Sequence, residues 1–174
     1  DKVSKDTYYD YSTGSRKTAY IESAFTYYST TNNVKSKQIA YYDIPTQKVS
    51  SIVVNQYTDS SETLELTSST EYRVTATGTK GTRLKETTSF VYVGPPENRE
   101  QKPVEVFTYD ASGNIVTEKN SYSYYAETGN LQSRKNYAPN GDILYSVEYA
   151  PDGLTIIKEE TWQYHSQGVP SLHV

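Results

Sequence analysis

The sequence predicts an all-β protein, an antiparallel meander of about ten strands joined by hairpins. Its 174 residues include 19 Tyr but only 3 Phe and 1 Trp, and Thr, Val and Ile are abundant, which suits a pleated, half-buried surface. A tyrosine followed four residues later by a glycine recurs along the C-terminal half. No apolar stripe with the helical period is present, so long helices are not expected.

The repeated glycines mark the turns of the predicted meander. The intervals between them are 16, 12, 12 and 15 residues, which leaves room for one short strand and one turn in each repeat. The repeats are YDASGNI with Gly113, YAETGNL with Gly129, YAPNGDI with Gly141, YAPDGLT with Gly153 and YHSQGVP with Gly168.

Two of these turns contain proline, and their residues predict a turn type. Pro139 and Pro151 fix φ for the first central position of a type I turn. Asn140 and Asp152 suit the second position, and the glycine then supplies the left-handed residue of a G1 bulge. Each such turn therefore joins two antiparallel strands.

The N-terminal half carries degenerate copies of the repeat, and its predicted strands are longer. In YSTTNNV we expect Asn33 to take the place of the glycine, because Asn tolerates positive φ. YDIPTQKV from Tyr42 and YTDSSETL from Tyr57 hold one extra turn residue, and TGTKGT forms a hairpin tip. The strands predicted here are 20–28, 34–42, 48–58, 63–77 and 83–93.

A Pro-rich connection, residues 94–103, separates the half 1–93 from the half 104–174. Either half alone would be a one-sided sheet too small to bury its apolar face. We therefore expect a single domain, 1–174, in which the halves form a sandwich or one curled sheet. A single-layer sheet is the alternative.

Alternation along the strands predicts which side chains are buried. The repeat tyrosine and the residue two positions after the glycine should share the apolar face, and Asp142, Ser146 and Glu148 should lie on the opposite face. Residues expected on the apolar face are Leu131, Tyr137, Ile143, Tyr145, Val147, Tyr149, Leu154, Ile156, Trp162 and Tyr164.

No catalytic, metal or cofactor site is predicted. His165 and His173 are the only histidines and lie in the last ten residues, and cysteine is absent. The carboxylates Asp110, Asp142 and Asp152 fall in or beside turns, where Asp is favoured for local hydrogen bonds. Glu159 and Glu160 are adjacent, so they point to opposite faces of a strand and cannot form a glycosidase pair.

Tyr122 and Tyr124 are the candidate ligand-binding residues. Their parity is opposite to that of Tyr125, the repeat tyrosine, so two rings about 7 Å apart along the strand would face outwards. Such rings could stack on sugars or serve a protein interface. A bulge that reverses parity in this longer repeat, or a second sheet over both faces, is the structural alternative.

The phrase YDASGNI resembles the YD repeat of Rhs-type and teneurin-type surface shells, whose units carry Tyr-Asp-x-x-Gly. The resemblance covers mainly residues 109–168, where Asp110 keeps the signature Asp. There are too few repeats to enclose a cargo chamber, so encapsulation is not implied. In composition and repeat style the chain is also similar to exported Tyr-rich β-repeat domains of unknown function from gut Bacteroidetes, which implies a secreted, cell-surface or periplasmic protein.

These observations predict a non-enzymatic exported module that binds a glycan or another envelope protein, or serves a structural surface role. The start at Asp1 and the Ser/Thr/Tyr-rich strands favour export. The net charge of −4 and scattered basic residues disfavour nucleic acid, and no apolar run is long enough to span a membrane as a helix. One alternative is a carrier or lipid-binding protein with an internal apolar cavity, and another is a carbohydrate-active enzyme.

Overall fold

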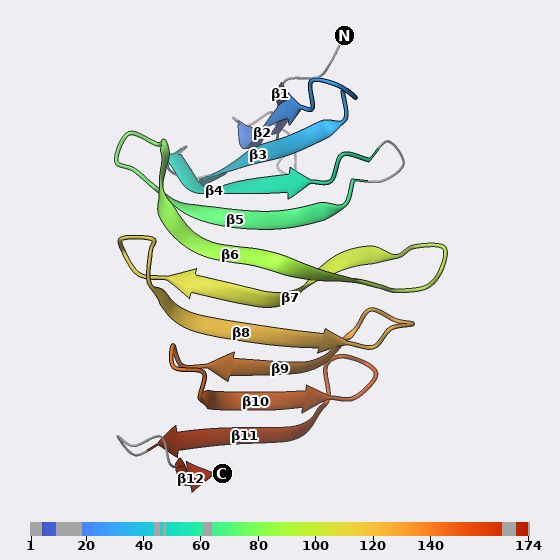
Figure 1. Cartoon of the computed structure of the whole chain (residues 1–174), viewed down its shortest axis with the longest axis vertical. Coiled ribbons are helices and arrows are strands. Elements are labelled where there is room, and N and C mark those ends of the chain that lie inside the picture. Colours follow the sequence, from blue (N-terminus) through green and yellow to red (C-terminus); the bar gives the residue numbers. More distant parts are fainter. Residues whose placement is uncertain are drawn as a thin grey trace. The chain divides into compact units, whose positions relative to one another are not determined.

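A computed structural model of the chain describes residues 5–9, 19–43, 46, 48–60, 64–164 and 170–173, and the side chains among them from residue 23 to 164. The predicted all-β antiparallel meander is confirmed: the order of strands in the sheet is their order in the chain (Figure 1). Twelve strands are described. They are β1 (Lys5–Tyr9), β2 (Ala19–Tyr27), β3 (Val34–Asp43), β4 (Lys48–Tyr57), β5 (Leu66–Val74), β6 (Lys80–Val93), β7 (Glu100–Tyr109), β8 (Val116–Tyr124), β9 (Leu131–Tyr137), β10 (Ile143–Tyr149), β11 (Ile156–Tyr164) and β12 (Pro170–His173).

The chain divides into two compact units, which are described separately. Unit 1 comprises Asp1–Glu86 with Ala111–Gly113, and unit 2 comprises Thr87–Asp110 with Asn114–Val174. The division falls inside β6 rather than in the Pro-rich stretch. That stretch is a hairpin loop of unit 2, closed by the Asn98 amide, which donates to the Pro95 carbonyl at 2.9 Å.

Within each unit the described strands form one layer, because their contacts join chain neighbours, β1 to β5 in unit 1 and β7 to β12 in unit 2. Burial in one layer comes from neighbouring side chains on the same face. Small polar residues beneath longer neighbours are therefore buried as fully as aliphatic ones. Apart from glycines, the buried residues in the described part of the chain are Ile52, Tyr57, Val93, Tyr109 and Val147, together with Ser23, Thr70, Thr87, Asn120 and Ser146.

The glycine turns are confirmed where the structure describes them. In the two Pro-containing turns, the Gly141 amide donates to the Ala138 carbonyl at 3.0 Å and the Gly153 amide to the Ala150 carbonyl at 2.8 Å. Both glycines have positive φ, 94° and 72°, as a type I turn with a G1 bulge requires. The turn at Gly168 lies outside the described residues.

The expected place of Asn33 is wrong by one residue. Asn32 is the residue with positive φ, 66°, and it lies four residues after Tyr28, the spacing that the glycine repeats keep. Asn33 instead begins the return of the chain, and its carbonyl accepts a hydrogen bond from the Tyr28 amide at 2.9 Å.

In nine of the described hairpins the register changes beside a tyrosine that is the last or next-to-last residue of its strand. In β7 and β8, for example, Thr108 pairs with Glu118 but Tyr109 pairs with Val116, so Thr117 is an extra residue. Such a bulge moves the following strand by one position relative to strict alternation. The tyrosines are Tyr9, Tyr27, Tyr42, Tyr57, Tyr109, Tyr124, Tyr137, Tyr149 and Tyr164.

These bulges and the single layer overturn part of the predicted apolar face. Leu154 and Ile156 are 83% and 51% exposed, although both were expected to be buried. Ser146, expected on the open face, is buried like its neighbour Val147. Strict alternation through the hairpins therefore assigns some side chains to the wrong face, because each bulge adds one residue that strict alternation does not include.

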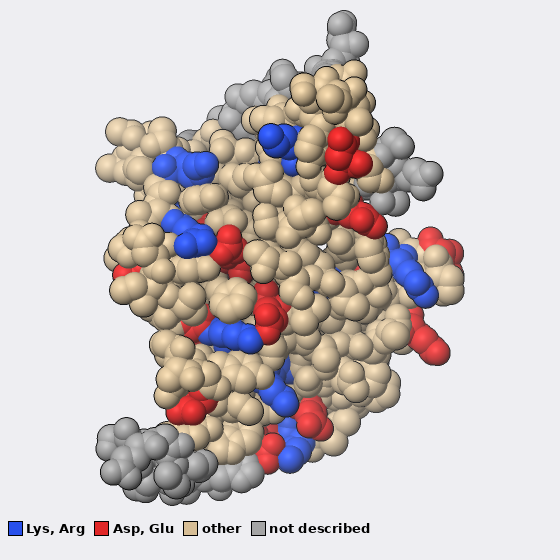
Figure 2. Space-filling view, in the orientation of Figure 1, with Lys and Arg blue, Asp and Glu red and all other residues tan. Residues whose placement is uncertain are grey.

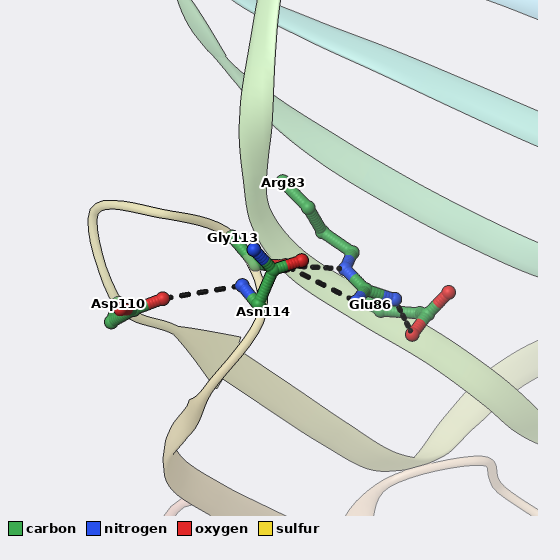
Figure 3. Close-up of polar contacts among 5 residues, drawn as sticks. All are labelled: Arg83, Glu86, Asp110, Gly113 and Asn114. Atoms are coloured by element: carbon green, nitrogen blue, oxygen red, sulfur yellow. Dashed lines mark hydrogen bonds and ion pairs between the residues drawn. The ribbon is translucent and has the colours of Figure 1, made fainter.

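One turn is held by an arginine rather than by its own residues alone. The Arg83 guanidinium donates from Nε and Nη2 to the Gly113 carbonyl at 3.2 and 3.1 Å, and Nη1 pairs with Glu86 at 2.8 Å (Figure 3). A Cβ on Gly113 would lie 2.8 Å from the Arg83 amide nitrogen. In the same hairpin, Asp110 accepts the Asn114 amide at 3.2 Å, the local turn bond expected of that carboxylate.

Candidate functional site

The predicted tyrosines lie on β8 in unit 2, and register shows what surrounds them. Tyr122 pairs with Arg134 of β9, and Asn120, two residues earlier, pairs with Asn136. Paired residues of antiparallel strands point to the same side of a sheet. These four residues, with Glu118, therefore lie on one side of the sheet, which we call the Tyr122 face.

Tyr124 differs from Tyr122 in its contacts. Its hydroxyl donates to the Pro103 carbonyl at 2.9 Å, and the Lys102 ammonium lies 5.8 Å from its ring centre. Burial, and secondarily the nearby Tyr122, raises the pKa of the Tyr124 hydroxyl to about 12. Tyr124 is thus anchored to β7, and both tyrosines are half-buried rather than fully exposed.

Tyr125 keeps the repeat spacing, four residues before Gly129, but it lies in the turn after β8 and not at the end of a strand. Tyr124, not Tyr125, ends β8, and it pairs with Leu131 after a register change. The equivalent of Tyr109 is therefore Tyr124, and the turn after it is one residue longer. The bulge considered as the structural alternative is present at this repeat.

A polar network occupies the Tyr122 face beside the tyrosines. Glu118 Oε1 accepts hydrogen bonds from the side-chain amides of Asn120 and Asn136, each at 2.7 Å. Asn120 Oδ1 in turn accepts from Arg134 Nε at 3.2 Å and from Asn136 at 3.3 Å. Asn120 is buried and Arg134 is exposed. The network therefore holds Arg134 through Nε, while the rest of the guanidinium faces solvent.

The face continues onto β10 and β11. Tyr145 pairs with Asn136, and Val147 pairs with Arg134 and then with Glu159. The Tyr145 hydroxyl donates to Glu159 Oε1 at 2.8 Å, and this hydrogen bond is the main cause that raises the pKa of Tyr145. A second tyrosine thus flanks Arg134, on the side away from Tyr122.

The remaining predicted residues have structural surroundings. Asp152 accepts the Leu154 and Thr155 amides at 2.8 and 2.9 Å as well as the Thr155 hydroxyl. The Thr155 hydroxyl and these two amides hold the pKa of Asp152 below its usual value. Asp142 accepts the Asn140 side-chain amide at 2.8 Å. All three turn carboxylates therefore make the local bonds that the sequence predicts.

Glu159 and Glu160 point to opposite faces as predicted, since they pair with Val147 and Ser146 respectively. Trp162 is half-buried. His165 and the side chain of His173 lie outside the described residues. Among the described residues no group of three or more His, Cys, Asp or Glu side chains could hold a metal ion.

Charged side chains are mixed over the surface. Figure 2 shows Lys and Arg interspersed with Asp and Glu on the viewed face. Several make close pairs, such as Lys119 with Glu105 at 2.5 Å. Among the described residues, no helix has the length and apolar character needed to cross a membrane.

Comparisons with known proteins establish no family. No protein-family model matches the chain, and no curated protein matches it. Among solved structures, a chain from "Crystal structure of GtfA/B complex" matches with 9% sequence identity and a TM-score of 0.23. The match covers 80% of this chain, which spans 19% of the length of that chain. Likeness at this level carries no argument about function.

The polar network is not predicted by the sequence patterns described above. Its signal is present in the alternating residues of two neighbouring repeats, Glu118-x-Asn120-x-Tyr122 and Arg134-x-Asn136. Both runs have the parity of Tyr122, so they could have been placed on one face. Their relative register depends on a bulge and a turn length, which alternation alone does not supply.

Proposed function

We propose that this chain is a non-enzymatic, exported binding module whose Tyr122 face binds glycans. The observation that carries the proposal is the position of Arg134, which pairs with Tyr122 on β8 and is a diagonal neighbour of Tyr145 on β10. Aromatic faces and fixed polar groups side by side suit a ligand with apolar C–H faces and equatorial hydroxyls, which describes a sugar.

The network supports recognition because its members are already oriented. Asn120 and Asn136 both bond to Glu118, so little side-chain freedom would be lost when a ligand binds. Arg134 can donate to hydroxyl or carboxylate oxygens of a sugar from nitrogens beyond Nε. An open sheet face also admits an internal segment of a long chain, whereas a closed pocket admits an end.

The same contacts favour binding over catalysis. Glu118 Oε1 already accepts hydrogen bonds from the side-chain amides of Asn120 and Asn136, so this oxygen is engaged within the protein rather than free to act on a ligand. Glu159 accepts the Tyr145 hydroxyl. Export remains the expectation that composition and repeat style support.

A glycan array tests the proposal. The purified chain should bind at least one class of polysaccharide, and Tyr122→Ala or Arg134→Ala should reduce that binding about tenfold or more, since each removes a stacking or charge-assisted contact. Lys135→Ala is the matched control: it removes a positive charge one residue away, on the opposite face. Binding to no glycan, or equal losses in all three variants, would contradict the proposal, and capture of a protein alone would indicate a protein interface instead.

A further inference from the structure

A pocket lies on the side of β8 opposite the Tyr122 face. Its volume is about 230 Å³, and its lining includes Ser123, Ser133, Glu148 and the tyrosines Tyr125 and Tyr149. Three of its polar residues come from three neighbouring strands at one level: Ser123 pairs with Ser133, and Ser133 pairs with Glu148. Gln132, next to Ser133 in the chain, also lines the pocket. We call it the serine pocket.

The hollow exists because two small residues stand side by side. The Ser123 and Ser133 hydroxyl oxygens are 2.7 Å apart and share a hydrogen bond, so they form a floor of hydroxyl groups. Larger side chains, including Tyr125 and Ile157, rise around it. The sequence therefore creates the pocket by interrupting a row of long side chains with a serine pair.

Tyr125 is fixed at the edge of this pocket. It belongs to the turn between β8 and β9, yet its hydroxyl donates to the Tyr149 carbonyl at the end of β10, at 2.8 Å. Two strand spacings are about 9.6 Å, which a tyrosine spans only when extended across the intervening strand. The ring is thus positioned before any ligand arrives.

The chemistry of the lining selects a class of ligand. Hydroxyl groups donate and accept, whereas the exposed Glu148 carboxylate only accepts and repels anions. A volume of about 230 Å³ corresponds to about eight water molecules at their volume in the liquid and is smaller than most pockets for drug-sized ligands. A small neutral polyol with one apolar face meets these conditions.

We propose that the serine pocket binds a single neutral sugar ring, with two ligand hydroxyls bonded to Glu148 and the serine floor and one ring face against Tyr125. This extends the proposed function, from which it takes the class of ligand. The module then carries two sugar sites on opposite faces of β8 and can link two glycan chains. Such bivalent attachment raises avidity without any new contact at either site.

The test is a titration of ¹⁵N-labelled chain with a panel of neutral methyl glycosides, followed by amide NMR. The expected result is saturable shifts of the Ser123, Ser133 and Glu148 amides with at least one glycoside. Glu148→Gln, at an exposed position, should weaken this binding about tenfold, and Ser133→Leu should abolish it by filling the pocket. Tyr122→Ala should leave these shifts unchanged.

The outcomes separate the two proposals. The absence of pocket shifts with every glycoside, or shifts that persist unchanged in Glu148→Gln, would overturn the serine pocket. Shifts with butylammonium but with no glycoside would also overturn it, since they would indicate a cation site. If the chain binds glycans on the array through Tyr122 but no glycoside shifts the amides of the serine pocket, only this inference is rejected. If glycosides shift those amides but no glycan binding depends on Tyr122, only the proposed function is rejected.

Discussion

The turn at residues 28–33 in unit 1 and the turn at residues 125–130 in unit 2 have the same hydrogen bonds. In the first, the Tyr28 amide donates to the Asn33 carbonyl at 2.9 Å and the Asn32 amide to the Tyr28 carbonyl at 3.0 Å. In the second, the Tyr125 amide donates to the Asn130 carbonyl at 2.9 Å and the Gly129 amide donates to the Tyr125 carbonyl at 2.8 Å. A threonine hydroxyl accepts the amide of the final asparagine in both.

Both turns also reach towards the second strand beyond their own. The Tyr28 hydroxyl donates to the Tyr57 carbonyl at 2.9 Å, as the Tyr125 hydroxyl does to the Tyr149 carbonyl at 2.8 Å. The tyrosine excess therefore has a structural cause in addition to any ligand. In a single layer, a long ring with a polar tip covers a neighbouring strand and satisfies a backbone carbonyl at its end.

The difference lies at the left-handed position, which is Asn32 in one turn and Gly129 in the other. Asn32 is exposed, whereas Gly129 is buried, and a Cβ there would lie 3.4 Å from Val93 Cγ2. The turn requires positive φ at this position, and the surrounding packing decides which residue supplies it. The pattern Tyr-x-x-Thr-(Asn or Gly)-Asn defines this turn better than tyrosine and glycine alone.

Exchange of the residues at the left-handed positions should give the largest change in the free energy of unfolding. The change should be large for Gly129→Asn and small for Asn32→Gly. We expect Gly129→Asn to lower the free energy of unfolding by about 2 kcal/mol, because the atoms beyond Cβ must be accommodated at a buried position where Cβ itself already contacts Val93, and because the residue must adopt positive φ. Asn32→Gly should change it by less than about 0.5 kcal/mol. Urea unfolding followed by Trp162 fluorescence or circular dichroism measures both, and equal losses would show that packing does not distinguish the turns.

Removal of the two bridging hydroxyls should have a smaller and matched effect. Tyr28→Phe and Tyr125→Phe should each cost about 1 kcal/mol, since each leaves a carbonyl without its donor. Tyr145→Phe is the control, because its hydroxyl bonds to an exposed carboxylate, and we expect only a few tenths of a kcal/mol. A loss of stability in only one of the two variants would show that the two hydrogen bonds contribute differently although their geometry is the same.

The last prediction concerns the pH dependence of Tyr124, which precedes the unit 2 turn as Tyr27 precedes the turn of unit 1. Its pKa of about 12 in the folded chain exceeds the ordinary value of 10.0, so folding favours the neutral phenol. This contribution to stability is complete below pH 10 and is lost as the pH rises from 10 towards 12. In an absorbance titration of the tyrosines, the phenolate signal that rises near pH 12 should be absent from Tyr124→Phe. A titration curve unchanged by this substitution would refute the assignment of the raised pKa to Tyr124.

Much of the fold follows from the sequence because turn chemistry is local. Glycines at a fixed distance from tyrosine, and proline before asparagine or aspartate, specify hairpins without knowledge of distant residues. Strands such as 34–42 were accordingly predicted to within one residue of β3. The Pro-rich stretch connects β6 to β7 as a hairpin loop, and its composition alone does not distinguish such a loop from a linker.

The candidate site was predictable only in part because it depends on register. Tyr122 was selected from its parity, but its partner Arg134 comes from the next strand, and the bulge at Tyr124 sets which residues meet. The identity of Tyr124 as the strand-ending tyrosine depends on the same bulge. One inserted residue reverses every side chain beyond it, so the faces could not be assigned from alternation alone.

Affinity electrophoresis tests the central claim, that the Tyr122 face binds glycans, most directly. Gels would contain the polysaccharide bound most strongly on the array, and migration would be compared with that in polysaccharide-free gels. The account predicts that the wild-type chain and Lys135→Ala are retarded, while Tyr122→Ala and Arg134→Ala migrate freely although they remain folded. Retardation of all four proteins alike, or of none, would contradict it.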